Sequence, residues 1–123
     1  MDNTESKEEM QELFEDVSNY FFLLSEPTRL KILHALCDGE RTVGEIVTEI
    51  EASQANVSRQ LNILYRAKIL ERRKDGTQVF YRVDDQATID VCRTVCTQMA
   101  SKMELKHQSK KTAVENFMTT GGE

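Results

Sequence analysis

Apolar residues recur every three or four positions over most of this chain, which is the spacing that places them on one face of a helix. The first such stretch follows Ser6 and Glu9, a pair with the spacing of a capping box. We therefore expect a first helix that starts at Ser6 and has an apolar face formed by Met10, Leu13, Phe14, Val17, Phe21 and Leu24.

The next helix is delimited by Pro27 and Gly39. Proline is favoured in a first helical turn, and glycine suits the left-handed residue that follows a last turn. The helix should cover about residues 27–38, and its inward residues should be Leu30, Leu33, Leu36 and Cys37.

Two shorter helices are expected after Gly39. Thr42 and Glu45 form a second capping box, which predicts a short helix with apolar residues Val43, Ile46, Val47 and Ile50. Ser53 is a suitable N-cap for a further helix, whose buried stripe should be Val57, Leu61 and Leu64.

After Ala67 the pattern changes from helix to strand. The dipeptide Asp75-Gly76 is a strong signal for a two-residue hairpin turn, because both turn positions need positive φ. Apolar residues then alternate as on a half-buried strand, at Val79, Tyr81 and Val83.

A last helix can be capped by Asp84 or Asp85 and should extend to about Met103. The residues after it are polar without sustained periodicity and are expected to fray or to be disordered. The chain should therefore divide into a flexible acidic N-terminus, one folded domain and a polar, disordered C-terminal tail, at residues 1–9, 10–103 and 104–123.

Composition fits one small domain. The chain has 123 residues, of which 39% are hydrophobic, with one proline and no tryptophan. Its apolar runs are far shorter than the roughly 18 residues of a membrane span, and its acidic start is unlike a signal peptide, so we expect a cytoplasmic protein without membrane association. Three cysteines in such a chain predict reduced thiols and no disulfide framework.

The net charge of −5 argues against a nucleic-acid partner, but the charges are unevenly distributed. Between Arg59 and Arg82, seven basic residues stand beside two acidic ones, whereas the first sixteen residues hold seven acids and one lysine. A local basic patch is expected of a phosphate-binding surface, although an ordinary solvated charged face explains the charges equally well.

Two short helices joined by a tight turn and followed by a basic hairpin have the layout of a winged helix-turn-helix. In such proteins the second helix lies in the major groove and the hairpin reaches neighbouring backbone or minor groove. The outward residues of the helix after Ser53 suit base edges and phosphates. The predicted DNA-contacting residues are Ser53, Gln54, Asn56, Ser58, Arg59, Asn62, Arg72, Arg73, Lys74, Thr77 and Gln78.

Four ordered motifs resemble the arsenic repressor (ArsR/SmtB) family, at Pro27–Leu33, Thr42–Ile46, Ser53–Leu61 and Asp75–Arg82. The resemblance implies a mainly α fold with a small β-hairpin, in the order of four helices, two strands and a fifth helix. It also implies a homodimer through the first and fifth helices, which represses transcription from a pseudo-palindromic double-stranded DNA operator until an effector lowers its affinity. Gln60 departs from the family pattern, because many members have histidine at this position. Whether Gln60 contacts a base or a phosphate stays open at this point.

Metal sites of the family can be compared position by position. A Cys-x-Cys site at the start of the third helix is matched here by Thr42 and Gly44, so that site is absent. For the zinc-type site of the fifth helix, Asp85 matches one ligand, but one carboxylate cannot hold zinc. The other matching positions are Ala87, Gln98 and Ser101, and neither His34 nor His107 repairs the deficit.

Cys92 and Cys96 lie on a predicted helix seam with Ile89, Met99 and Met103, at spacings of 3, 4, 3 and 4. Cysteine packs as a small hydrophobe, so packing alone explains the stripe. Residues four apart on a helix are too distant for an unstrained disulfide, but two thiolates there can close on one soft ion.

A further ligand could come from Cys37 or from a thiol across the dimer axis. Some members of the family sense reactive sulfur through one cysteine in the second helix and one in the fifth, which suggests a sulfur-bridged or persulfide form. The predicted effectors are therefore arsenite, a soft divalent metal ion or reactive sulfur at Cys37, Cys92 and Cys96, and no cofactor is required.

Three functions remain open on these residues. The first is a repressor with a thiol-based effector site, and the second is a repressor whose cysteines are structural. The third, of another class, is a small thiol redox or metal-carrying protein. The sequence shows no Gly-rich phosphate loop, no nucleophile with a recognisable base and no paired acids at an interpretable spacing, so we predict that it is not an enzyme.

Overall fold

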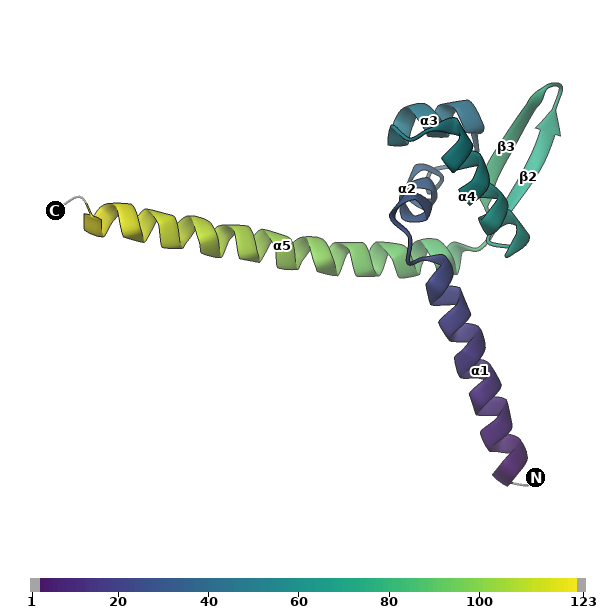
Figure 1. Ribbon diagram of the computed structural model, residues 1–123, viewed down its shortest axis with the longest axis horizontal. Coiled ribbons are helices and arrows are strands. Elements are labelled where there is room, and N and C mark those ends of the chain that lie inside the picture. Colours follow the sequence, from purple (N-terminus) through teal and green to yellow (C-terminus); the bar gives the residue numbers. More distant parts are fainter. Residues whose placement is uncertain (1–2, 122–123) are drawn as a thin grey trace. The chain divides into compact units, whose positions relative to one another are not determined.

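The computed structural model describes residues 3–121 and divides the chain into two compact units, residues 1–89 and 90–123. The elements drawn in Figure 1 are α1 (Asn3–Leu23), α2 (Pro27–Ala35), β1 (Arg41–Thr42), α3 (Val43–Ile50), α4 (Gln54–Arg66), β2 (Leu70–Asp75), β3 (Gln78–Val83) and α5 (Gln86–Gly121). The predicted mainly α fold with a β-hairpin is confirmed. No helix within residues 3–121 is long and apolar enough to span a membrane.

The core of the first unit lies among α2, α3 and α4, which contact one another pairwise. The predicted stripe on α4 is fully buried, and each such aliphatic side chain contributes roughly 1.5–3 kcal/mol through burial. On α2 the prediction is partly wrong, because Leu30 and Cys37 are only half-buried. The main buried apolar residues are Ile32, Leu33, Leu36, Ile46, Val57, Leu61, Leu64 and Leu70.

Local capping explains where the central helices begin. The predicted box at α3 is confirmed, since Thr42 Oγ1 accepts the Glu45 backbone N–H at 3.2 Å and Glu45 Oε1 accepts the Thr42 N–H at 3.4 Å. Ser53 caps α4 by accepting the Asn56 N–H at 3.2 Å. Glu26 is the N-cap of α2, and its carboxylate accepts the Arg29 N–H at 2.9 Å. Hydrogen bonds from the backbone N–H groups of Thr28 and Arg29 hold the pKa of the Glu26 carboxyl below its usual range.

The end of α2 differs from the prediction. The helix ends at Ala35, with Leu36 as C-cap, three residues before the predicted end at Asp38. Gly39 has φ +146°, a conformation that glycine adopts without strain, but it follows a turn and not the last helical residue.

The sheet is antiparallel in the order β1-β3-β2, and the short strand β1 was not predicted. The hairpin turn lies one residue later than expected: Asp75 pairs with Gln78, so the turn residues are Gly76 and Thr77. Gly76 has φ +63°, and Thr77 is not among the residues with positive φ. This is the two-residue turn with glycine first, which requires only one positive φ.

The helix α1 begins at Asn3, so the proposed cap at Ser6 is wrong, and residues 3–9 of the segment predicted to be flexible are helical. Residues 1–2 of that segment lie outside the described residues. The end of α1 is anchored to the first unit, where the Tyr20 hydroxyl donates to Thr88 Oγ1 at 2.8 Å.

Asp85 caps α5, as predicted, by accepting the Ala87 N–H at 3.0 Å. The helix then continues to Gly121, so the expected disordered tail is helical up to that residue, and residues 122–123 lie outside the described residues. The physical reason is that Lys, Leu, Met, Gln, Ala and Glu are good helix formers and that neither proline nor glycine occurs in α5 before Gly121.

Candidate nucleic-acid interface

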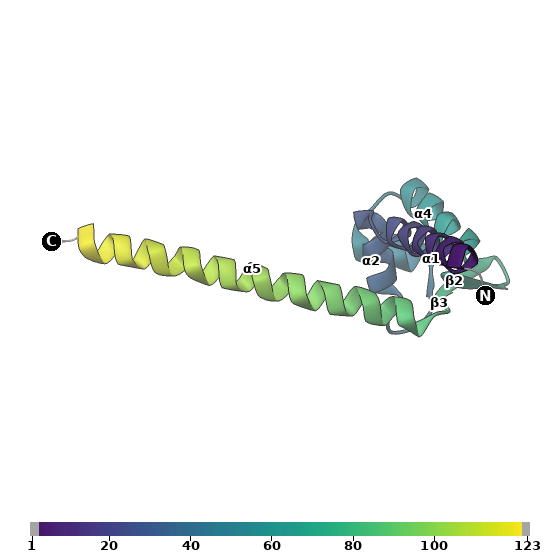
Figure 2. The same ribbon diagram turned by 90° about the horizontal axis from the view of Figure 1, so that it is seen from below.

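The helices α3 and α4 form a helix-turn-helix. Their turn is Glu51-Ala52-Ser53, and Glu51 takes the left-handed conformation with φ +54° and ψ +44°. The two helices contact each other directly, and Ile46 of α3 and Val57 of α4 are fully buried. The helix α4 also contacts the strand β2 directly. The two elements lie near each other in Figure 1 and in Figure 2, which is turned by 90°.

The outward face of α4 consists of polar residues at its first two turns. Gln54, Ser58 and Arg59 are exposed, whereas Asn56 and Asn62 are half-buried. Ser53 is exposed, and its hydroxyl already serves as the N-cap. Gln54, Ser58 and Arg59 are therefore the side chains of α4 most available to a partner.

Gln60 is 7% exposed and points into the first unit, so the structure removes it from the outward face. Its Oε1 accepts a 2.8 Å hydrogen bond from Nη1 of Arg29, which is also 7% exposed. Its Nε2 donates to Asn56 Oδ1 at 3.2 Å. Sequence reasoning missed this pair, although an arginine among the apolar residues of α2 was a signal that could have found it.

Asn56 is surrounded by further hydrogen bonds. Its Oδ1 also accepts from Arg59 Nη2 at 3.2 Å, and its Nδ2 donates to Thr28 Oγ1 at 3.4 Å. Asn56, one of the predicted DNA-contacting residues, is thus hydrogen-bonded to three neighbouring side chains.

On the hairpin, Arg72 and Arg73 lie on opposite faces of β2. The Arg72 guanidinium stacks 4.0 Å from the Tyr65 ring centroid, and a hydrogen bond with Tyr81 raises the pKa of Arg72. Within residues 3–121, no carboxylate forms an ion pair with Arg72. Arg72 is therefore placed to offer a cation beside α4.

Arg73, in contrast, is held by an acid. Its Nε donates to both Glu40 carboxylate oxygens at 2.8 and 3.1 Å, and its guanidinium lies 4.3 Å from the Phe80 ring centroid. These bonds from Arg73 lower the pKa of the Glu40 carboxyl. Arg82 is similarly paired with Glu71. Both arginines therefore use part of their donors and charge in these pairs, and they are less available to a phosphate than Arg72.

The remaining predicted residues of the hairpin are exposed, namely Lys74, Thr77 and Gln78. Lys74 precedes Asp75 at the tip, and Thr77 is a turn residue. Within residues 3–121, the exposed cations of α4, the hairpin and the segment between them that form no ion pair with a carboxylate are Arg59, Arg66, Lys68, Arg72 and Lys74.

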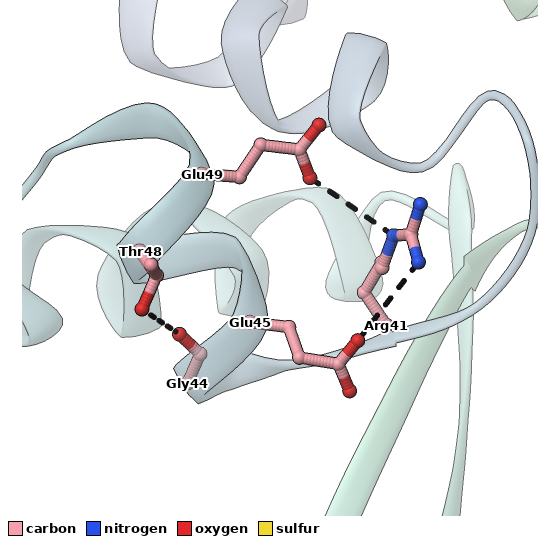
Figure 3. Close-up of a pocket in the computed structure, with 5 residues that line it drawn as sticks. All are labelled: Arg41, Gly44, Glu45, Thr48 and Glu49. Atoms are coloured by element: carbon pink, nitrogen blue, oxygen red, sulfur yellow. Dashed lines mark hydrogen bonds and ion pairs between the residues drawn. The ribbon is translucent and has the colours of Figure 1, made fainter.

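A shallow hollow at the start of α3 is shown in Figure 3. Arg41 lies between Glu45 and Glu49 there, with nitrogen–oxygen distances of 3.9 and 4.0 Å. Thr48 Oγ1 donates to the Gly44 carbonyl at 3.0 Å. The residues that line the hollow carry more acid than base and no thiol or imidazole, so they suit neither a phosphate nor a soft metal ion.

The three cysteines are free thiols in two different units. Cys37 is half-buried after α2 in the first unit, whereas Cys92 is half-buried and Cys96 exposed on α5 in the second. Burial, and after it the charge of Cys96, raises the pKa of the Cys92 thiol. Within residues 3–121, no three His, Cys, Asp or Glu side chains gather where they could hold a metal ion.

A helix-turn-helix with a polar second helix, followed by a β-hairpin that carries cations, defines the winged helix-turn-helix class of DNA-binding proteins. Comparison with known proteins agrees with this class. Residues 26–72 match the family described as bacterial regulatory protein, arsR family. The chain belongs to this arsR family.

Individual similar proteins are also described as repressors or as winged helix-turn-helix DNA-binding domains. The biofilm growth-associated repressor of Xylella fastidiosa (strain Temecula1) is 33% identical over 97 residues, which are 76% of this chain and 85% of that protein. The crystal structure of the AntR antimony-specific transcriptional repressor has a TM-score of 0.68 at 25% identity, and the match covers 73% of this chain and 82% of that one. A solution structure of Mb0332 from Mycobacterium bovis, described as a homodimeric winged helix-turn-helix DNA-binding domain, has a TM-score of 0.65 at 27% identity and covers 73% and 83%.

The family consists of regulators of transcription, so the prediction that this chain is a DNA-binding regulator and not an enzyme is confirmed. The third alternative, a redox or metal-carrying protein, is not supported by the family.

Proposed function

We propose that the protein is a transcriptional repressor that binds double-stranded DNA as a homodimer, with α4 of each copy in the major groove. The observation that carries this proposal is the polar face of α4, where Gln54, Ser58 and Arg59 are exposed beside the cation Arg72. Amide, hydroxyl and guanidinium groups are those that read base edges and phosphates. A two-fold axis would place two copies of α4 about 34–36 Å apart, on a pseudo-palindromic site.

Unpartnered apolar faces support the homodimer. In α1 the residues Met10, Phe14 and Phe21 are about half exposed, and in α5 the same holds for Met99 and Met103. A contiguous exposed apolar face on a helix usually marks an interface. The Mb0332 domain, described as homodimeric, supports the same assembly here.

The test of DNA binding uses a duplex selected by the wild-type protein from a randomised library, compared with a scrambled duplex in a mobility shift at several salt concentrations. We expect tight binding to the selected duplex only. Because each phosphate contact releases counterions, affinity should fall about 50-fold between 0.1 and 0.3 M salt if about four phosphates are contacted. Equal affinity for both duplexes, or an affinity independent of salt, would contradict the proposal.

We further propose that thiol chemistry at Cys92 and Cys96 releases the repressor from DNA. The two residues are four apart on one continuous helix, so their sulfurs can close on one soft ion such as arsenite or cadmium. A third ligand would come from the partner copy, and a sulfur adduct of a cysteine is the alternative effector. The antimony-specific relative supports a soft ion as the effector class.

The effector test titrates the DNA complex with arsenite, cadmium, zinc and polysulfide. We expect one of these reagents to weaken binding by about 5- to 150-fold, as a coupling of 1–3 kcal/mol allows, and Cys92→Ser to abolish the response. Since the raised pKa of Cys92 keeps its proton at neutral pH, release by a metal should strengthen as pH rises from 7 to 8.5. No release by any reagent would show that the cysteines only pack, and Cys37→Ser reveals whether Cys37 takes part.

A further inference from the structure

One guanidinium connects two helices of the first unit. Arg29 Nε donates to the Leu23 carbonyl at 2.6 Å and Nη2 donates to the Phe22 carbonyl at 3.3 Å, at the end of α1. Both carbonyls belong to the last turn of α1, which lacks intrahelical donors, and the Phe22 carbonyl also accepts the Ser25 N–H at 3.1 Å. The third bond of the same guanidinium goes to Gln60 on α4. Arg29 therefore holds Gln60 against a fixed point of the backbone.

The bonds beyond Arg29 have a defined polarity. A guanidinium only donates, so the atom of Gln60 that faces it must be the oxygen, and the Gln60 amide nitrogen must face Asn56. The atom of Asn56 that receives this N–H must in turn be its oxygen, which also receives Arg59. The orientation of two amides thus follows from the position of one buried arginine.

This polarity limits what Asn56 can offer to DNA. Its oxygen accepts two hydrogen bonds and one of its two N–H groups is used by Thr28 Oγ1, which leaves a single N–H donor. The paired acceptor and donor with which asparagine reads adenine are not both available. The Asn56 oxygen instead fixes one end of the exposed Arg59 guanidinium.

We infer that Arg29 and Gln60 are positioning residues for DNA recognition, which fix Asn56 as the support that aims Arg59 at the DNA. The inference rests on the proposed binding of DNA by α4. In this arrangement Gln54, Ser58 and Arg59 contact the DNA directly. Asn56 mainly holds Arg59 in place, and only one of its N–H groups stays available to DNA. A half-buried support held by three hydrogen bonds reduces the side-chain entropy that Arg59 loses on binding.

The substitution Gln60→Glu tests the inference because it keeps the acceptor for Arg29 and removes the N–H donor to Asn56. A carboxylate still accepts from Arg29, and it adds a counter-ion to this buried cation, so the melting temperature should not fall. It cannot donate to Asn56, whose amide must then turn over, and Arg59 loses its acceptor. We expect affinity for the selected duplex to fall about 5- to 50-fold, with less than a threefold change for the scrambled duplex at the same salt.

A double-mutant cycle with Asn56→Ala separates positioning from a general structural effect. If Gln60 acts through Asn56, then Gln60→Glu should cost no further specific affinity when Asn56 is already alanine. Losses that add in the double variant would overturn the inference, as would unchanged specificity of Gln60→Glu. A wild type that does not discriminate the two duplexes would instead contradict the proposed function itself.

A second measurement needs no variant. In the free wild-type protein, ¹⁵N relaxation of the side-chain amides should show Gln60 and Asn56 to be nearly as rigid as the helix backbone, with order parameters near 0.85. Order parameters below about 0.6 for these amides would overturn the inference even if Gln60→Glu did not fold.

Discussion

Replacing Phe14 by glutamate is expected to convert the protein to a monomer and to lower its affinity for the selected duplex by about 100-fold or more. The Phe14 side chain is 60% exposed on the apolar face of α1, which we propose to lie in the dimer interface. A two-fold interface would contain the new carboxylate twice, and burying unpaired or like charges costs several kcal/mol, where about 1.4 kcal/mol corresponds to tenfold.

The oligomeric state of Phe14→Glu is measured by sedimentation, and DNA binding by mobility shift at the same concentration. The matched control is Asn19→Glu, which adds the same charge to α1 at another exposed position, away from the apolar face. The control should remain dimeric and bind normally. A Phe14→Glu variant that stays dimeric with full affinity would exclude this face of α1 from the interface.

Replacing Arg59 by alanine is expected to weaken binding to the selected duplex about 10- to 100-fold, in line with roughly 1–3 kcal/mol for a guanidinium that contacts DNA. Arg59 is exposed on the second turn of α4, and its Nη2 is oriented by Asn56. The control is Arg93→Ala, which removes the same charge from an exposed position of α5 and should change affinity less than threefold.

The salt dependence of DNA binding by Arg59→Ala shows whether Arg59 contacts a phosphate or a base edge. If Arg59 binds phosphate, the slope of log affinity against log salt should decrease by about 1 and all sequences should be affected alike. If Arg59 binds a base edge, discrimination at one position should relax while the slope stays nearly constant. An unchanged affinity for both duplexes would remove Arg59 from the interface.

The parts of the fold that were predicted correctly depend on neighbours in the chain. The capping box at Thr42 and the N-cap at Ser53 are bonds between residues three apart, so spacing alone specifies them. The buried stripe of α4 follows from helical periodicity. The cap at Ser6 failed although its spacing was suitable, because the helix already begins three residues earlier, at Asn3, with the acidic Glu5 in its first turn.

The predictions at the hairpin and in α5 were wrong because the local sequence there is compatible with more than one conformation. Asp75-Gly76 and Gly76-Thr77 both make acceptable two-residue turns, and the register of β2 and β3 selects the second. The residues after Met103 are mostly polar and have no sustained apolar periodicity, but their helix propensity extends α5 to Gly121.

By itself, the sequence determined the helix-turn-helix, the polar recognition helix and the cations that follow it, because caps, periodicity and charge are properties of short segments. Only the tertiary structure decided which polar residues remain available. Arg29 and Gln60 are 31 residues apart and meet through packing of α2 on α4, and Glu40 reaches Arg73 across 33 residues. A hydrogen bond between distant segments leaves no periodic trace in a sequence, so the division of α4 into contacting and supporting side chains depends on the fold.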